Sequence, residues 1–295
     1  TARPTASASA TPRSRSGRSR APRPHAVCAV QRPISFLSDY GLADDFVGVC
    51  HGVIARIAPG ARVLDLTHGV PRHDVRSGAL ILRRALPYCP PGVHLAVVDP
   101  DVGGERLAVA VRTAENDRIL VGPDNGLLSL AVARFGGALE AVDIGLSRHR
   151  LEPASATFHG RDIFAPVAAA LAAGAHLADA GEPMDPDELV TLEMPLGRAE
   201  GDQLVAHAVR VDRFGNVMLD VEHEELAAFG LKLGQPMTAN GARCIYATTF
   251  ADVPEGELLV YEDAYRTLAL AVNRGSAAEL LGLALDDEVR LGPAE

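Results

Sequence analysis

The chain of 295 residues lacks several common signatures of nucleotide and hydrolase sites. It contains no G-x-G-x-x-G fingerprint, no Walker A loop and no G-x-S-x-G elbow, which argues against a dinucleotide fold, a P-loop enzyme and a serine hydrolase. It has no tryptophan and a single lysine, Lys232. Its four cysteines are scattered without a C-x-x-C pair: Cys28, Cys50, Cys89 and Cys244. This usage fits the reducing cytoplasm and gives no zinc signal. We also expect no bound cofactor.

Long apolar runs are also missing. The composition, 47% hydrophobic and 22% charged, is that of an ordinary globular protein. No apolar run approaches the roughly 18 to 20 residues that a membrane span needs. We therefore expect no membrane association.

Acidic residues are absent from the first 32 positions, which carry seven arginines. Because the whole chain has a net charge of −10 and this segment contributes +7, the remainder carries −17. A strongly acidic body repels phosphate backbones, so nucleic acid is not expected as the main partner. Residues 1–32 are rich in Ser, Ala, Pro and Arg, and we predict a disordered leader that does not join the core.

From residue 34 the pattern becomes regular. Short apolar runs, predicted as strands, alternate with segments of helical spacing that often end at Pro or Gly. The predicted strands are 34–38, 62–66, 93–98, 107–112 and 119–121, and the predicted helices are 46–57, 74–88, 127–135 and 163–173. This alternation is typical of βαβ units, so residues 33–197 are predicted to form an α/β domain with a largely parallel sheet.

The sequence pattern changes after about residue 198. Short β-prone runs now follow one another, separated by Gly, Asp and Pro, without long helices between them. They lie at 204–211, 217–219, 244–248, 258–261, 267–272 and 288–291. Such spacing predicts a smaller all-β domain, a sandwich or barrel, over residues 198–295.

One predicted strand stops abruptly at a carboxylate. Asp99 directly follows the apolar run 93–98, and a turn rich in Pro and Gly delivers Arg106 seven residues later. In open α/β sheets ligands bind at the carboxyl ends of the strands, which favours a polar site here. A capped turn with a surface ion pair explains this segment equally well.

A second group of polar residues could hold a metal ion. Asp65 and His68 lie close to His73 and Asp74 in the sequence. The group lacks the H-E-x-x-H spacing, and Pro71 breaks any fixed helical relation between its members. Hydrogen bonding within a loop is the simpler interpretation, and no metal site is predicted.

Seven motifs occur in the order and approximate spacing of one protein family. They are Ser38-Asp39-Tyr40-Gly41, Asp65-Leu66-Thr67-His68, Asp99-Pro100 to Arg106, Pro123 to Leu127, Phe158-His159-Gly160-Arg161-Asp162, Asp212-Arg213-Phe214-Gly215-Asn216, and Asn273 to Ala278. Together they resemble the S-adenosyl-L-methionine (SAM) hydroxide adenosyltransferases, the adenosine-forming SAM hydrolases related to the SAM-dependent fluorinase and chlorinase. The resemblance runs from about residue 33 to 293.

The resemblance implies an α/β domain, a β-barrel-like domain, and a homotrimer that holds SAM between neighbouring subunits. It also implies that Asp99, Arg106 and His159 hold and activate water, which attacks C5′ of the substrate ribose and releases adenosine and L-methionine. Without the resemblance, His159 is best interpreted as a residue that hydrogen-bonds backbone at a helix start.

The same resemblance assigns the substrate contacts. Asp39 would bind the two ribose hydroxyls and Asp212 the methionine ammonium group, with His73 also at the substrate. Phe214 would stack near adenine, and Asn216 would hydrogen-bond to it. Ala277 and Ala278 would offer backbone contacts to adenine. Taken alone, Asp39 could instead cap a helix, the segment 212–216 is a β-turn, and the two alanines are ordinary helix formers.

The chain departs from the family at one turn. The usual Pro-Gly-Val-Gly-Thr is here Pro100-Asp101-Val102-Gly103-Gly104, so Asp101 would be strained if the usual glycine takes a positive φ. Two alternatives to hydrolysis remain. A halogenase would make 5′-halo-5′-deoxyadenosine, but the halogenating relatives have Tyr where Asp99 stands. A SAM or adenosine sensor would need Asp39, Phe214 and Asn216 without the three residues around water.

Overall fold

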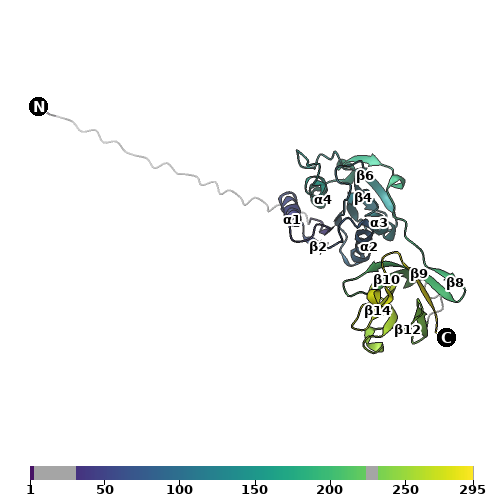
Figure 1. Cartoon of the computed structure of the whole chain (residues 1–295). Helices are drawn as coiled ribbons and strands as arrows, with labels where there is room; N and C mark the ends of the chain where they lie inside the picture. The colour runs from purple at the N-terminus through teal and green to yellow at the C-terminus, as the bar shows by residue number, and fades with distance from the viewer. Residues whose placement is uncertain (3–30, 224–231, 295) are drawn as a thin grey trace. The chain divides into compact units, whose positions relative to one another are not determined.

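The computed structural model describes residues 1–2, 31–223 and 232–294, and these form two β-sheets with separate hydrophobic cores (Figure 1). The predicted leader lies almost entirely outside the described residues. Gln31 and Arg32 are described and bond to the α/β half, because Gln31 Oε1 accepts from Gly60 N and Arg32 N donates to Ala172 O.

The first sheet has seven strands in the order β2-β1-β3-β5-β4-β6-β7. They are β1 (Ile34–Ser38), β2 (Val63–Thr67), β3 (Val93–Val97), β4 (Ala108–Thr113), β5 (Ile119–Pro123), β6 (Ala138–Asp143) and β7 (Glu182–Met184). The pairs β1–β2, β1–β3 and β3–β5 are parallel, whereas β4 runs antiparallel to both neighbours and β7 to β6. Five of the seven strands therefore run in one direction.

Helices cover both faces of this sheet (Figure 1). The helices are α1 (Phe46–Ile57), α2 (Val75–Ala85), α3 (Ser129–Arg134) and α4 (Ala165–Ala172). Successive strand residues point to opposite faces. Phe36 accordingly packs in the core beneath α1 and α4, and Leu37 in the core beneath α2 and α3. Short helical turns complete this half: Leu86–Tyr88, Gly160–Phe164, Leu177–Asp179 and Pro186–Glu188.

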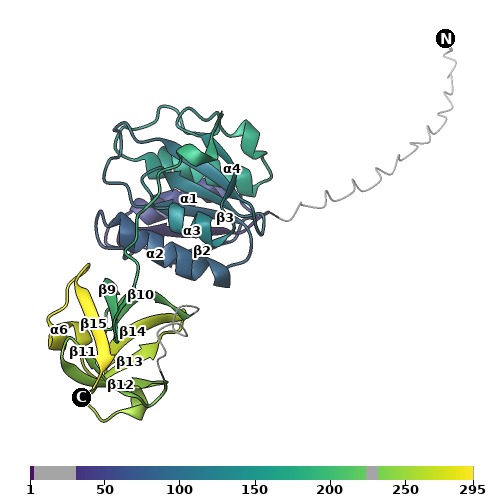
Figure 2. The same ribbon diagram turned by 90° about the vertical axis from the view of Figure 1, so that its right-hand side faces the viewer.

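The second sheet closes into a barrel. Its order is β10-β14-β13-β12-β11-β15-β9, with β9 pairing back to β10 and β8 added at the outside (Figure 2). The strands are β8 (Arg198–Glu200), β9 (Gln203–Val211), β10 (Val217–Glu222), β11 (Pro236–Ala239), β12 (Ala242–Ala247), β13 (Leu258–Glu262), β14 (Thr267–Val272) and β15 (Glu288–Pro293). A 3-10 turn, Phe250–Asp252, and a short helix, α6 (Ala277–Leu281), lie between strands. The predicted fold class is confirmed.

Local chemistry explains where the elements end. The helix α2 begins because the Asp74 carboxylate accepts from Ser77 N at 2.9 Å, which is the usual N-cap bond. Pro87 cannot continue an α-helix, so the single helix predicted for 74–88 ends at Ala85 and continues as a 3-10 turn. Among the described residues, no helix combines the length and apolar character that crossing a bilayer requires.

Candidate active site

The structure brings Asp99, Arg106 and His159 together. Asp99 follows β3, Arg106 precedes β4, and His159 begins the helical turn before α4. Arg106 Nε donates to Asp99 Oδ1 at 2.8 Å, and its Nη2 contacts both Asp99 Oδ2 and His159 Nδ1, the latter at 2.8 Å. The Arg106 and Asp99 side chains are only 8% and 6% exposed. We call this group the triad.

Two loops hold the triad in place. Gly103, at φ 79°, sits so close to the carbonyl of Ala156 that any Cβ there would collide with it. The second loop is pinned by the buried Asp162, which accepts from Ser155 N at 2.8 Å and pairs with Arg161. The positive φ of this turn falls on Gly103 and not on Asp101, so Asp101 is accommodated without left-handed strain.

The electrostatics of the triad fix the state of His159. Burial first, and then the Arg106 guanidinium, lower the pKa of His159 below its ordinary value, so the imidazole is neutral near pH 7. Arg106 has only donors, which means that His159 Nδ1 accepts. The single ring proton of His159 is then on Nε2, and this atom can donate a hydrogen bond to a ligand oxygen.

Tyr40 forms an apolar wall beside the triad that the sequence analysis did not assign. Its ring packs edge-on against Phe158, with the ring centroids 5.8 Å apart, and its centroid lies 5.7 Å from that of the Phe46 ring. Its hydroxyl lies against Gly160, where any Cβ would collide with it. Burial first, then the nearby Cys50, raises the pKa of Tyr40 well above its ordinary value, so the phenol stays protonated. The only sequence signal for this role is its place inside the motif that contains Asp39.

Asp39 and His73 also meet at this edge of the sheet. Asp39 follows β1, and its backbone N donates to Val97 O at the end of β3. The backbone N of His73, a residue at φ 64°, donates to Asp39 Oδ2 at 3.0 Å. His73 therefore contacts Asp39 through its backbone N–H. A carboxylate at the end of a central strand is well placed to accept from ligand hydroxyls.

A second polar loop lies on the barrel. Asp212 Oδ1 accepts from the backbone of Phe214 at 2.8 Å and of Asn216 at 3.0 Å, and its Oδ2 accepts from the Asn216 amide at 2.9 Å. Gly215 O accepts from Ala278 N at 3.0 Å, which joins the loop to α6. The Phe214 side chain is 68% exposed.

The residues predicted to bind substrate therefore form two groups. Asp39 and His73 lie at the edge of the first sheet with the triad, and the other five lie on the barrel: Asp212, Phe214, Asn216, Ala277 and Ala278. Ala277 is fully buried in the barrel core, backbone included, whereas Ala278 is partly exposed. Within the part of the chain that the structure describes, no hydrogen bond or ion pair joins the two groups.

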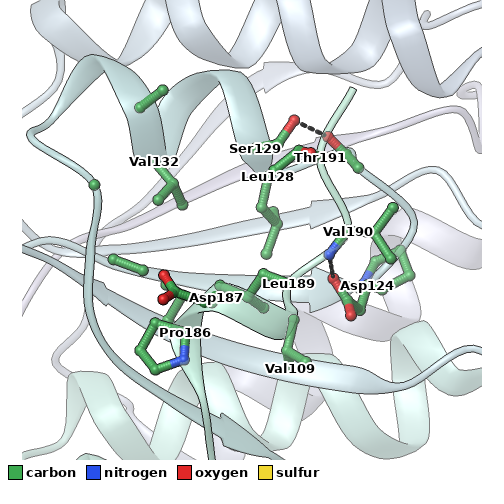
Figure 3. A pocket seen from close by; sticks show the side chains of 16 residues that line it. Val109, Asp124, Leu128, Ser129, Val132, Pro186, Asp187, Leu189, Val190 and Thr191 are labelled. Carbon is green, nitrogen blue, oxygen red and sulfur yellow. Dashed lines mark hydrogen bonds between the residues drawn. The ribbon is translucent and has the colours of Figure 1, made fainter. Parts of the chain in front are cut away.

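A mainly apolar pocket of about 230 Å³, partly open to solvent, lies elsewhere, between β4, β5, α3 and residues 186–191 (Figure 3). Its lining includes Val109, Leu128, Val132 and Leu189, and none of the triad. The Asp124 carboxylate in its lining accepts from Val190 N at 3.0 Å, and burial raises the pKa of Asp124. The convergent polar chemistry is therefore at the sheet edge and not in this pocket.

Metal-ligating side chains do gather once among the described residues. His51, Asp65 and His68 place one possible ligand atom each within 4.8 Å of the others. Asp65 and His68 lie near His73 and Asp74 in the sequence, but in the structure the third member of their group is His51. His51 was missed because it lies on α1, and only the packing of this helix beside β2 brings it close.

Comparisons with known proteins agree with this division. Residues 34–181 match the family model of the SAM hydroxide adenosyltransferase N-terminal domain, and residues 206–290 match that of its C-terminal domain. The chain is 50% identical to an (R)-S-adenosyl-L-methionine hydrolase of Salinispora tropica, over 88% of this chain and 97% of that protein. It is 29% identical to a fluorinase of Nocardia brasiliensis, over 84% and 93% of the two chains. A solved structure from Thermotoga maritima, described as an uncharacterized conserved protein, superposes with a TM-score of 0.82 at 35% identity, covering 88% of this chain and 99% of that one.

Proposed function

Since the chain belongs to the SAM hydroxide adenosyltransferase family, we propose that it hydrolyses SAM to adenosine and L-methionine. The observation that carries this proposal is the contact of the buried Asp99–Arg106 pair with His159. A carboxylate, a fixed cation and a neutral imidazole donor converge at one point. They offer an acceptor and donors to a single oxygen, which is what a positioned water needs.

The proposed step is an in-line displacement at C5′ of the ribose. The C5′–O bond forms as the C5′–S bond breaks, and the electron pair of the broken bond neutralises the sulfonium. Methionine leaves as a neutral thioether, so no acid is needed to protonate the leaving group. The protein must instead orient the water and accept its proton.

The geometry supports a division of these tasks among the three residues. His159 Nε2 carries the ring proton and therefore donates to the water oxygen. Arg106 supplies a permanent positive charge that stabilises developing hydroxide. Asp99 keeps lone pairs beyond those used by Arg106, so it is the member of the triad that accepts the proton from water.

Substrate binding is proposed to use both groups of residues. Asp39 clamps the ribose hydroxyls beside the triad, with the His73 backbone fixing its carboxylate. The methionine and adenine ends bind the exposed and partly exposed residues of the barrel group: Asp212, Phe214, Asn216 and the backbone of Ala278. We propose a homotrimer in which the barrel residues of each site come from a neighbouring subunit. This arrangement would also cover the exposed Phe214 ring.

Asp99 also argues against halogenation. A carboxylate repels a halide strongly in a site shielded from water, whereas it accepts a hydrogen bond from water. The competing product, 5′-halo-5′-deoxyadenosine, is therefore not expected even in high chloride. We further propose that the protein acts in the cytoplasm, as its free Cys50, Cys89 and Cys244 suggest.

The test is chromatography of SAM incubated with the pure full-length protein. We expect adenosine and methionine in equal amounts, with no chlorinated nucleoside when chloride is added. We also expect no cofactor or metal requirement, so turnover should persist in EDTA. A halogenated product, or no turnover of bound SAM, would overturn the assignment in favour of a halogenase or a sensor.

A further inference from the structure

Three side chains outside the triad form a compact cluster between α1 and β2. His51 Nε2 lies 2.9 Å from Asp65 Oδ1, and His68 Nε2 lies 3.1 Å from the same oxygen. His51 and Asp65 are 35% and 42% exposed, while His68 is only 3% exposed. One side of the cluster therefore faces solvent, and the other is built into the protein.

The buried imidazole nitrogen of this cluster, His68 Nε2, makes no hydrogen bond. His68 Nε2 is buried without a hydrogen-bond partner, although Asp65 Oδ1 lies at contact distance. At 3.1 Å, poor alignment is what prevents the bond. A metal bonded to both atoms at about 2.0–2.2 Å lies off the line between them, so the nitrogen lone pair must point about 40° away from that line. A nitrogen and an oxygen at contact distance without a hydrogen bond between them are compatible with a shared cation lying off the line that joins them.

The opposite nitrogen of His68 is already held. His68 Nδ1 lies 2.8 Å from the hydroxyl of Ser38, which is fully buried, and the same hydroxyl accepts from Tyr40 N at 3.3 Å. Metal-binding histidines commonly have their second nitrogen fixed in this way, because a partner there sets the tautomer and the ring orientation.

We propose that His51, Asp65 and His68 form a binding site for a divalent transition-metal cation, with Zn²⁺ as the best fit. Two imidazoles and one carboxylate suit zinc, while Mg²⁺ and Ca²⁺ require sets of oxygen ligands. Water can take the fourth position on the exposed side. Ligand atoms in a tetrahedral zinc site are separated by about 3.3 Å, so small rotations of the exposed His51 and Asp65 complete the geometry.

The site has no part in the proposed reaction. It would tie α1 to the end of β2, whose following residue His68 accepts from Gly41 N at 2.7 Å through its backbone carbonyl. Metal binding would therefore stabilise the fold around the loop that contains Asp39, without contacting the triad.

The test is equilibrium dialysis of the full chain, free of any affinity tag and stripped with EDTA, against Zn²⁺ and separately against Mg²⁺. We expect one bound Zn²⁺ per chain, no bound Mg²⁺, and a melting temperature higher by about 5 °C at a hundredfold excess over Kd. His51→Ala and Asp65→Asn should each weaken zinc binding at least about tenfold. Both side chains are partly exposed, and circular dichroism checks that each variant folds.

The matched control is His176→Ala, which removes an exposed histidine of the same half of the chain and should leave zinc binding unchanged. Absence of stoichiometric Zn²⁺, or equal binding by folded His51→Ala and Asp65→Asn, would overturn the inference. SAM turnover measured on the same stripped samples separates the two proposals. Hydrolysis without zinc binding would refute only the metal site, and zinc binding without hydrolysis would refute only the proposed function.

Discussion

At the scale of single residues, the triad depends on a buried charge pair. Arg106 and Asp99 are almost fully shielded, so each compensates a charge that would otherwise be costly to bury. The planar guanidinium reaches both carboxylate oxygens and still contacts His159 Nδ1. A lysine ammonium is a point charge and could not hold both partners in this geometry.

Substitution of the triad should separate chemistry from binding. Asp99→Ala and His159→Ala should each lower kcat roughly 10²-fold or more, the usual scale for a positioned acid–base group. The SAM affinity should stay within a few-fold, since neither is assigned to substrate contacts. Asp39→Ala should instead weaken SAM binding. Steady-state kinetics and calorimetry measure the two effects.

The control is Asp101→Ala, which removes an exposed carboxylate from the same turn and should leave both parameters unchanged. Circular dichroism checks that Asp99→Ala folds, because Arg106 loses its counterion there. If Asp99→Ala abolished SAM binding while Asp39→Ala left it intact, the roles of the two carboxylates would be exchanged.

Protonation of His159 should abolish catalysis at the site. An added proton on Nδ1 would face the Arg106 donors, although Asp99 and Asp162 nearby favour the charged ring. Because the pKa of His159 is lowered from 6.5, the acid limb of kcat/KM should be centred below pH 6.5. A pH–rate profile measures this. His159→Gln, whose amide oxygen can still accept from Arg106, should lose this acid limb. An acid limb of the wild-type protein centred above pH 6.5 would contradict the assignment.

At the scale of elements, the sequence predicted those with strong periodicity. The central strands β1, β2 and β3 and the helix α1 were predicted within a residue or two. All residues of β1 and β3 are buried and α1 buries one face, whereas β2 was found from its short apolar run although none of its residues is fully buried. The short strands β7 and β8 were missed because they are three residues long and mostly exposed. β6 carries two exposed residues in its first half, which hid its pattern.

The candidate site was less visible in the pattern alone. Asp99 was flagged because it ends a buried run, but His159 stands in a loop whose position depends on Asp162 and on contacts with Gly103. Its role came from the family resemblance. Tyr40 and His51 were missed since nothing in their local sequence shows which distant residues they will meet. Tertiary packing decides such contacts, and periodicity does not report it.

A buried histidine ties three strands together and should make stability depend on pH. His94 on β3 lies 2.7 Å from Ser35 Oγ on β1, and Arg118, just before β5, donates to its Nε2 at 3.0 Å. Burial first, and then Arg118, lower the pKa of His94 to about 3. The folded state therefore excludes a proton that the unfolded chain binds below pH 6.5. Stability should fall as the pH drops from 6.5 towards 3, by at most about 1.4 kcal/mol per pH unit from this group.

Urea unfolding between pH 6.5 and 5 measures this slope in a range where most carboxylates stay ionised. His94→Gln can keep both hydrogen bonds without a titrating group, so its slope should be smaller. The exposed His176→Gln should keep the wild-type slope. Identical slopes for His94→Gln and the wild type would show that His94 is not the source.

At the scale of the whole molecule, residues 1–30 and the adjoining Gln31 and Arg32 are expected to contribute differently to stability. Residues 1–30 have too few large apolar side chains to add to a core. Deleting them should leave the melting temperature and SAM turnover unchanged. Extending the deletion through Gln31 and Arg32 removes their bonds to Gly60 and Ala172 and should lower the melting temperature by a few degrees. A lower melting temperature after the first deletion alone would show that the segment is structural.

The proposed homotrimer makes a stronger prediction about the whole molecule. If each site combines the triad of one subunit with the Asp212 loop of a neighbour, Asp99→Ala and Asp212→Ala damage opposite halves of the site. Each variant alone should be nearly inactive. A mixed trimer contains one site built from two intact halves, so activity should recover to roughly one third of wild type.

Co-expression with two different tags and sequential purification yields the mixed species, and light scattering checks its mass. A double variant, Asp99→Ala with Asp212→Ala, co-expressed with Asp99→Ala is the control. This control combination should recover no activity, because none of its subunits carries an intact triad. Were the mixed species of the two single variants also inactive, both halves of the site would belong to one chain, and the interface site would be refuted whatever the oligomeric state.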